Sequence, residues 1–323
     1  MKNKMAAVVA GLMVFAVAVT GCSRNESTGT TAAPETAETK AAETKVPETE
    51  TSGSDEASAD DTAILVVSFG TSFNDSREAT IGAVEEAISE ANPGYEVRRA
   101  FTSQIIIDKL KERDGLEIDN VTQALDRAVA DGVKNLVVQP THLMDGLEYM
   151  DVVDELAEYE EDFDSVSIGE PLLTSDEDFQ AVAEAITEDT KGSDDGETAI
   201  VFMGHGTEAE SNQVYAKMQE VLAAGGHENY YIGTVEAEPT LEDVIAALKE
   251  KGIYKKVVLQ PLMVVAGDHA NNDMAGGEED SWKTALEAEG YDVECVIKGL
   301  GELPAIRSIY VEHTRAALEG LSK

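Results

Sequence analysis

Cysteine and basic side chains are scarce in this sequence of 323 residues. Its 2 cysteines, Cys22 and Cys295, are too few for a disulfide scaffold or a cysteine-rich metal cluster, so any metal site has to rely on histidine and carboxylate. Lys and Arg number 24 against 64 Asp and Glu, which gives a formal net charge of −40. Because such a surface repels phosphate backbones, we expect no nucleic-acid partner.

Glycine-rich nucleotide loops are also missing from the sequence. Neither G-x-G-x-x-G nor G-x-x-x-x-G-K-S/T occurs, and the glycines near residues 68–72 are too sparse to cradle a phosphate. This absence disfavours a Rossmann dehydrogenase and a P-loop enzyme, and we expect no nucleotide cofactor.

Residues 1–21 have the features of an export signal. Lys2 and Lys4 precede the apolar run 5–19, which is shorter than the about 20 residues that a membrane-spanning helix needs. Cys22 follows Thr-Gly directly, an arrangement that resembles a bacterial lipobox and implies that Cys22 is the lipidated first residue of the mature protein. We therefore expect an extracytoplasmic protein, lipid-anchored to a bacterial membrane. The alternative is an ordinary secreted protein with a chance cysteine.

Residues 22–61 are predicted to be a disordered acidic tether. Val46 is the only large aliphatic residue between residues 23 and 60, aromatic residues are absent there, and acids outnumber bases. Such a segment cannot bury enough apolar surface to offset its conformational entropy. Its role is to hold the folded part away from the membrane surface.

From residue 62 onward, short β-branched runs alternate with longer amphipathic stretches, which is typical of βαβ units and a parallel sheet. Strands are predicted at 63–69, 95–101, 135–140, 165–168, 199–203, 230–235, 256–263 and 292–298. The segment Ala-Ile-Leu-Val-Val-Ser-Phe-Gly-Thr-Ser at 63–72 matches Ala-Ile-Val-Phe-Met-Gly-His-Gly-Thr-Glu at 199–208, and two later pairs of strands match in the same order. The sequence thus predicts an α/β protein of two similar doubly wound lobes, residues 62–190 and 191–323.

Ligands of open α/β sheets bind beyond the carboxyl ends of the strands, so the residues at those ends are candidates for the site. In the second lobe three strand ends offer His205, Glu236 and His269. Two imidazoles and a carboxylate suit a divalent first-row transition metal that keeps open coordination positions, unlike a closed structural zinc site. A single histidine at a strand end is more often a surface or hydrogen-bonded residue, but here two fall at equivalent ends.

Further strand ends supply candidate substrate-binding residues, namely Ser68, Phe69, Gly70, Thr71, His142 and Gly204. Gly204 and Gly206 remove bulk on both sides of His205, which would let a large ligand approach that imidazole. His142 is either a cleft residue or a structural one, and Glu148 lies in an acidic helix start where most carboxylates cap or solvate. His227 and His313 are expected to be solvated.

Several segments, taken in their order along the chain, resemble the sequence of a known protein family. They are 66–72, 99–103, Val-Phe-Met-Gly-His-Gly at 201–206, the stretch 261–275 with Gly-Asp-His-Ala-Asn-Asn-Asp-Met, 281–283 and 299–307. Together they resemble the anaerobic sirohydrochlorin cobaltochelatases of the class II chelatase superfamily, over roughly residues 62–320. The signal and the tether lie outside the match.

The resemblance implies ATP-independent insertion of Co²⁺, as substrate metal, into the tetrapyrrole sirohydrochlorin on the anaerobic route to cobalamin. It implies that His205 and His269 form the metal site, that Glu236 joins them as a ligand, and that Glu148 is a further catalytic residue. Because two pyrrole protons have to leave the ring, we expect His205 and His269 to accept protons as well. Arg98, Arg99, Lys109 and Arg113 are candidates for holding the substrate's carboxylates. Some exported relatives carry haem between subunits, a role to which no residue here is matched. The sequence leaves open whether the protein forms homo-oligomers.

The predicted export favours a second hypothesis for the function. Tetrapyrrole intermediates are made in the cytoplasm, so an exported chelatase has no obvious supply of its substrate. An exported lipoprotein that binds or delivers a metal or a metallated tetrapyrrole, without turnover, would use the same His and Glu residues. The residues of the site accept Co²⁺, Ni²⁺, Fe²⁺ or Zn²⁺, so the preference for cobalt comes from the resemblance alone.

Overall fold

The computed structural model describes residues 59–321. The predicted export signal, Cys22 and all but the end of the predicted tether lie outside the described residues. Among those described, no helix is both long and apolar enough to cross a membrane.

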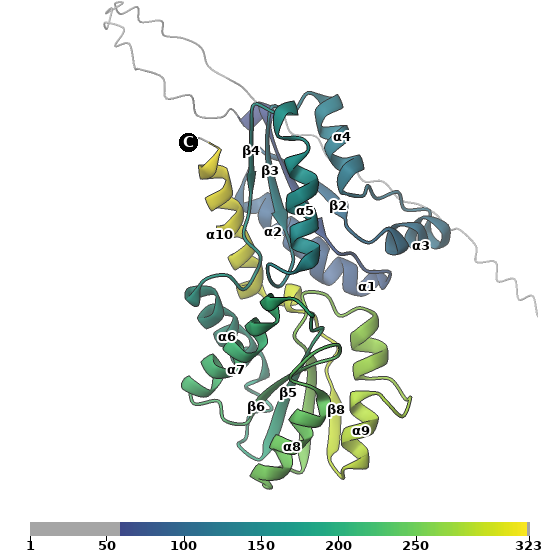
Figure 1. The fold of residues 1–323 in the computed structure, drawn as a ribbon, viewed down its shortest axis with the longest axis vertical. Helices are drawn as coiled ribbons and strands as arrows, with labels where there is room; N and C mark the ends of the chain where they lie inside the picture. The colour runs from purple at the N-terminus through teal and green to yellow at the C-terminus, as the bar shows by residue number, and fades with distance from the viewer. Residues whose placement is uncertain (1–58, 322–323) are drawn as a thin grey trace, which may run out of the picture. The chain divides into compact units, whose positions relative to one another are not determined.

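Two parallel sheets of four strands each form the described part of the chain (Figure 1). The first has the order β2-β1-β3-β4 and the second the order β6-β5-β7-β8. The strands are β1 Thr62–Ser68, β2 Glu96–Phe101, β3 Asn135–Pro140, β4 Ser165–Ile168, β5 Thr198–Gly204, β6 Tyr230–Thr234, β7 Lys256–Pro261 and β8 Asp292–Cys295. The predicted fold class of two similar α/β lobes is therefore confirmed.

The register of the sheets repeats between the lobes. Val67 at the end of β1 pairs with Pro140 of β3, and Met203 of β5 pairs with Pro261 of β7. Every residue of β1 and of β5 is buried, as expected for central parallel strands that are covered by helices on both faces. Because the two sheets have the same order and register, they place equivalent strand ends in equivalent positions.

Helices connect the strands in both lobes. They are α1 Asn74–Arg77, α2 Ala83–Ala91, α3 Gln104–Asp114, α4 Val121–Asp131, α5 Leu147–Ala157, α6 Asp176–Thr190, α7 Gln213–Ala224, α8 Leu241–Lys251, α9 Trp282–Ala288 and α10 Pro304–Gly320. Two π-helical turns, η2 Glu78–Gly82 and η5 Ala270–Met274, follow β1 and β7. Short 3-10 turns are η1 Ala59–Asp61, η3 Glu160–Asp162, η4 Glu210–Asn212 and η6 Leu300–Glu302.

Helix starts follow from local sequence. Reciprocal capping boxes begin α4 with Asn120, α6 with Ser175 and α8 with Thr240, each paired with the side chain three residues later. In each case the cap satisfies a backbone N–H that has no partner within the helix, which fixes where the helix begins.

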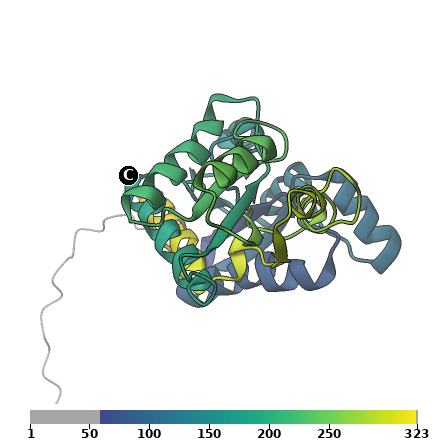
Figure 2. The ribbon, with the colours of Figure 1, turned by 90° about the horizontal axis from the view of Figure 1, so that it is seen from below.

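Two helices cross between the lobes. The last helix, α10, packs against α2, β3 and β4 of the first lobe, and α6 packs against both α7 and α10. Figures 1 and 2 show α10, in yellow, alongside the purple-blue α2. One hydrophobic cluster accordingly contains Val66 and Val137 of the first sheet together with Phe202 of the second. A division of the chain at residue 190 would separate α6 and α10 from elements that they pack against.

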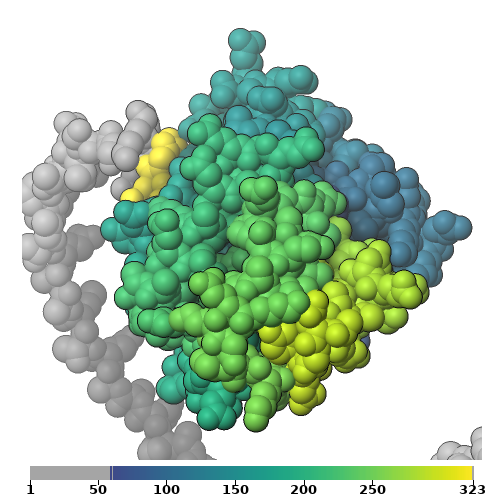
Figure 3. Space-filling view, turned by 60° about the horizontal axis from the view of Figure 1, so that its bottom comes forward, coloured from purple at the N-terminus to yellow at the C-terminus, as the bar shows by residue number. Residues whose placement is uncertain are grey.

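The second lobe covers the face of the molecule drawn in Figure 3, where its segments appear in green to yellow-green with blue segments of the first lobe at their edge. The two lobes touch close to the strand ends. A Cβ built on Gly267, in the loop after β7, would lie 3.4 Å from Thr71 Oγ1, in the loop after β1. The loops that follow equivalent strands of the two lobes are therefore neighbours.

Candidate active site

Three strand ends of the second lobe meet at one point. His205 follows β5 directly, Glu236 lies two residues after β6, and His269 ends the loop that follows β7. One potential ligand atom from each of these side chains lies within 4.8 Å of the other two. The structure thus brings together the three residues that the sequence proposed as metal ligands.

The His205 ring is oriented by its own backbone. Nδ1 lies 2.7 Å from the carbonyl oxygen of Gly206. A carbonyl can only accept, so Nδ1 carries the proton and donates it, which leaves the Nε2 lone pair free. Nε2 faces Glu236, 3.9 Å from Oε1. This tautomer is the one that presents Nε2 to a metal.

The His269 ring is oriented by a carboxylate. Its Nδ1 lies 2.6 Å from Asp273 Oδ2, one turn further along η5. A carboxylate that accepts the second ring N–H of a ligating histidine fixes its tautomer and the orientation of its ring. The rings of His205 and His269 stand edge to face, with centroids 4.7 Å apart and planes at 85°. Asp273 was not singled out from the sequence, although the spacing His-x-x-x-Asp at a helix start is a usable signal.

Glu236 is held through its backbone while its side chain stays exposed. Its N–H donates to the carbonyl oxygen of His205 at 2.9 Å. The turn behind it is closed by Thr234, whose hydroxyl donates to the carbonyl of Ala237 at 2.6 Å. The carboxylate therefore starts from a fixed point beside His205 and can still rotate.

Glu148 faces this group from the first lobe. It lies in the first turn of α5, where the helix dipole favours a negative charge. Burial raises the pKa of its carboxyl group, and the neighbouring His205 opposes that rise. The structure therefore places Glu148 within electrostatic range of a metal-ligand candidate, across the boundary between the two lobes.

His142 lies behind Glu148 and is buried. Its Nε2 is 3.9 Å from Glu148 Oε2. Burial lowers the pKa of His142 from 6.5 to about 4, so the ring is neutral near pH 7.

The other candidate substrate-binding residues differ in accessibility. Phe69 is 46% exposed at the end of β1, whereas Ser68 is buried and shares a 2.7 Å hydrogen bond with Thr141. Thr71 is buried beside Gly267. Of these three, Phe69 is the one that can offer a face to a large ligand.

The glycines beside His205 serve packing within the protein, which corrects the expectation that they make room for a ligand. A Cβ on Gly204 would lie 2.2 Å from the ring of Tyr215. Gly206 has φ +88°, in the left-handed region, and its Cβ would lie 2.8 Å from the backbone nitrogen of Ala237. Gly70 likewise has φ +99° and abuts Phe101.

The arginines proposed for the substrate's carboxylates are already paired. Arg98 binds Glu96 and Asp131, Arg99 binds Glu85, and Arg113 binds Asp114. Lys109 is exposed on α3. The three arginines therefore compensate acidic neighbours on the first lobe.

His313 is not solvated as expected. On α10 its Nδ1 lies 3.0 Å from the carbonyl oxygen of Glu170 and its Nε2 lies 3.1 Å from Asp178 Oδ1. His227 is half-buried, with its ring edge to face against Tyr230. The partner of His313 is 135 residues away in sequence, so no local pattern could reveal the contact.

Comparison with known proteins agrees with this geometry. Residues 62–319 match the family model described as cobalt chelatase (CbiK). A sirohydrochlorin cobaltochelatase of Salmonella typhimurium is 39% identical over 256 residues, which cover 79% of this chain and 96% of that protein. Sirohydrochlorin cobaltochelatase CbiKC of Nitratidesulfovibrio vulgaris is 33% identical over 260 residues, covering 80% of this chain and 91% of that one.

Among solved structures, SirB from Bacillus subtilis with Fe³⁺ aligns with a TM-score of 0.56 and 15% identity, over 80% of this chain and 97% of that chain. At this identity the likeness shows that the two proteins share a fold. The family model spans both sheets and every strand end described above. The chain therefore belongs to the cobalt chelatase (CbiK) family.

Proposed function

We propose that this protein is a sirohydrochlorin cobaltochelatase, which inserts Co²⁺ into sirohydrochlorin without a nucleotide and releases two protons. The observation that carries the proposal is the convergence of His205, Glu236 and His269, whose ligand atoms lie within 4.8 Å of one another. The two curated relatives that bear this activity in their names support the choice of metal and ring.

The three ligands suit a metal that has to leave again. Two imidazole nitrogens and one carboxylate oxygen leave coordination positions open, and such a set binds divalent first-row metals without enclosing them. All three side chains are reachable from solvent, with His205 48% and Glu236 56% exposed. A site of this kind can take up Co²⁺, present it on one face to the macrocycle, and release it into the ring.

Protons have to move in the opposite direction. Sirohydrochlorin loses two pyrrole N–H protons as its nitrogens bind the metal, so two proton acceptors are needed nearby. Nε2 of His205 and of His269 become free when the metal departs, and each can then accept a proton. Glu148 on the facing lobe is the further acceptor, because partial burial raises the pKa of its carboxyl group and so makes it a better base.

An anaerobic absorbance assay with the purified protein, sirohydrochlorin and Co²⁺ tests the proposal. His205→Ala and His269→Ala are the test variants, and His227→Ala, a half-buried histidine outside the ligand set, is the matched control. Many rings metallated per polypeptide, lost in both test variants and kept in the control, is the expected result. Stoichiometric binding at the uncatalysed rate would instead indicate a delivery protein for a metal or a metallated tetrapyrrole.

The preference for cobalt is tested in the same assay. Equal concentrations of Co²⁺, Ni²⁺, Fe²⁺ and Zn²⁺ are offered separately, with the uncatalysed rate subtracted for each metal. We expect the largest ratio of catalysed to uncatalysed rate for Co²⁺. A larger ratio for another metal would contradict the assignment of cobalt and leave the chelatase chemistry intact.

We also propose that the protein is lipid-anchored outside the cytoplasm through Cys22. The support is the order of a basic segment, an apolar run and Thr-Gly-Cys at residues 1–22. Metabolic labelling with a radioactive fatty acid in a bacterial host, compared with Cys22→Ser, tests this. Label in the parent and none in the variant is expected, and an unlabelled parent would contradict the anchor.

A further inference from the structure

His142 is a buried side chain whose hydrogen-bonding capacity is unused within the described part of the chain. Its side chain is 8% exposed. Neither Nδ1 nor Nε2 has a hydrogen-bond partner there. Leaving a buried polar group unpaired costs about 1–3 kcal/mol, so such a group needs a functional or structural explanation.

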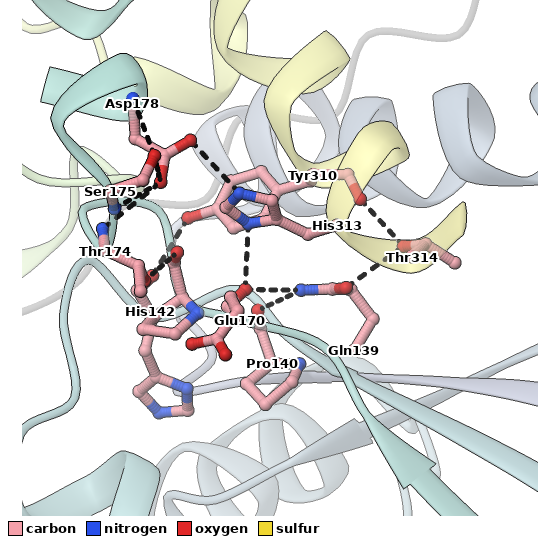
Figure 4. Close-up of polar contacts among 11 residues, drawn as sticks. Gln139, Pro140, His142, Glu170, Thr174, Ser175, Asp178, Tyr310, His313 and Thr314 are labelled. Atoms are coloured by element: carbon pink, nitrogen blue, oxygen red, sulfur yellow. Dashed lines mark hydrogen bonds and ion pairs between the residues drawn. The ribbon is translucent and has the colours of Figure 1, made fainter. Parts of the chain in front are cut away.

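The backbone of His142, by contrast, is held on several sides. The carbonyl oxygen of His142 accepts from the backbone N–H of Leu172 at 3.0 Å and from the Tyr310 hydroxyl at 3.1 Å. That hydroxyl also lies 3.1 Å from the carbonyl of Thr141. Figure 4 shows Tyr310, on the yellow helix α10, beside the backbone of His142. These contacts fix the backbone from which the His142 ring extends.

The same helix braces the neighbouring backbone. His313 touches the carbonyl of Glu170 and the carboxylate of Asp178, which lies at the start of α6. Gln139 donates to the carbonyl of Glu170 at 3.0 Å and accepts from the Thr314 hydroxyl at 3.2 Å. In Figure 4 the His142 ring points away from this network, and no dashed line reaches it. The network therefore supports the ring without using its nitrogens.

Glu148 is the polar side chain that the ring faces. The separation of 3.9 Å between His142 Nε2 and Glu148 Oε2 is about 1 Å longer than a hydrogen bond. His142 is fixed, whereas the Glu148 side chain is 53% exposed and free to rotate about its own bonds. Hydrogen bonds of catalytic groups are often long in the free enzyme and tighten in the substrate complex.

We propose that His142 is a positioning residue, whose ring N–H donates a hydrogen bond to the Glu148 carboxylate and holds it toward His205 during metal insertion. This inference rests on the proposed chelatase function. A neutral ring has one N–H to donate, and burial keeps His142 neutral near pH 7. The donated hydrogen bond orients Glu148 and favours its ionised form, in which it can accept a proton from the tetrapyrrole.

A double-mutant cycle distinguishes this role from simple support of the fold. The single variants are His142→Phe, which removes the donor, and Glu148→Gln, and the third variant combines them. We expect His142→Phe to lower kcat roughly tenfold with little change in KM, as for other residues that orient a catalytic group. In the Glu148→Gln background the same change should have no further effect. Equal losses in both backgrounds would overturn the proposal.

His142→Gln serves as the conservative variant, because its amide N–H can still reach toward Glu148. Recovery of most of the lost kcat in His142→Gln is expected, and a rate equal to that of His142→Phe would contradict a role as donor. Binding of Co²⁺ alone, followed by visible absorbance, should stay unchanged in all His142 variants because His205, Glu236 and His269 are untouched.

A measurement without turnover separates this inference from the proposed function. In protein labelled with ¹⁵N at histidine and saturated with metal-free sirohydrochlorin, the ring N–H resonance of His142 should move in Glu148→Ala and stay in place in Asp145→Ala, a nearby exposed carboxylate. An unmoved resonance would overturn the contact even if the wild-type protein is an active chelatase. A moved resonance in a protein without turnover would support the contact and refute the enzyme.

Discussion

Buried His142 makes stability depend on pH in a calculable way. Its pKa is about 4 in the folded protein against an ordinary value of 6.5. Between these values the unfolded chain binds a proton that the folded protein does not, so stability is full above pH 6.5 and falls as the pH drops toward 4. At 1.36 kcal/mol per pKa unit, the whole difference is worth about 3 kcal/mol.

The assay is urea unfolding followed by circular dichroism at pH 7.5, 6.5, 5.5 and 4.5, for the wild-type protein and His142→Leu. Leucine fills much of the same volume and cannot take up a proton. We expect the free energy of unfolding of the wild-type protein to fall by about 2–3 kcal/mol more than that of the variant over this range. Other acid-sensitive groups, such as the pair of Asp178 and His313, are common to both proteins and cancel in the comparison.

Parallel pH dependences for the two proteins would refute the reasoning. They would mean that His142 is protonated in the folded state as easily as in the unfolded chain, through water or a carboxylate that stabilises the cation. The variant also tests the direction of the pH effect on stability. Because His142→Leu removes the group that takes up the proton, this substitution should not destabilise the protein more at pH 4.5 than at pH 7.5.

Three further predictions concern other contacts. Asp273→Ala should weaken Co²⁺ binding by roughly 10- to 100-fold in an absorbance titration, because it orients a ligand histidine, and unchanged affinity would contradict that role. Gly204→Ala should lower the free energy of unfolding in urea by about 1–3 kcal/mol, since its Cβ has no room beside a tyrosine ring, and Gly277→Ala, with open space around it, is the control. His313→Leu should lower the free energy of unfolding by about 1–3 kcal/mol, because Asp178 Oδ1 loses its donor while Ser175 still binds Oδ2; the same change should cost less in an Asp178→Asn background, and additive losses would contradict the pairing.

Much of the fold is readable from local sequence. The strands from β1 to β8 are short β-branched runs bounded by turn residues, and their predicted bounds differ little from the observed ones. The duplication predicts equivalent strand ends, and His205 and His269 stand at two of them. These features depend on residues that are close in the sequence or on an internal repeat. They can therefore be predicted without knowledge of the tertiary structure.

Apart from Asp273, which lies one helical turn from His269, the missed contacts join residues that are distant in the sequence. His313 pairs with Asp178 because α10 crosses to the first lobe, which no periodicity records. Arg99 is neutralised by Glu85, a pairing set by the packing of α2 on β2. Gly204 makes way for Tyr215 and not for a ligand. Composition shows that such residues exist, but only the folded chain shows what each one touches.

The crossing of α10 also sets an order of events for a chain made from its amino terminus. The first sheet is complete in sequence by residue 168, yet the helix that covers β3 and β4 begins only at residue 304. During synthesis the first lobe therefore leaves the ribosome with part of its sheet uncovered, and it stays uncovered until α10 has been made. Since that helix also fixes the backbone of His142, a truncated product cannot assemble the first-lobe side of the site.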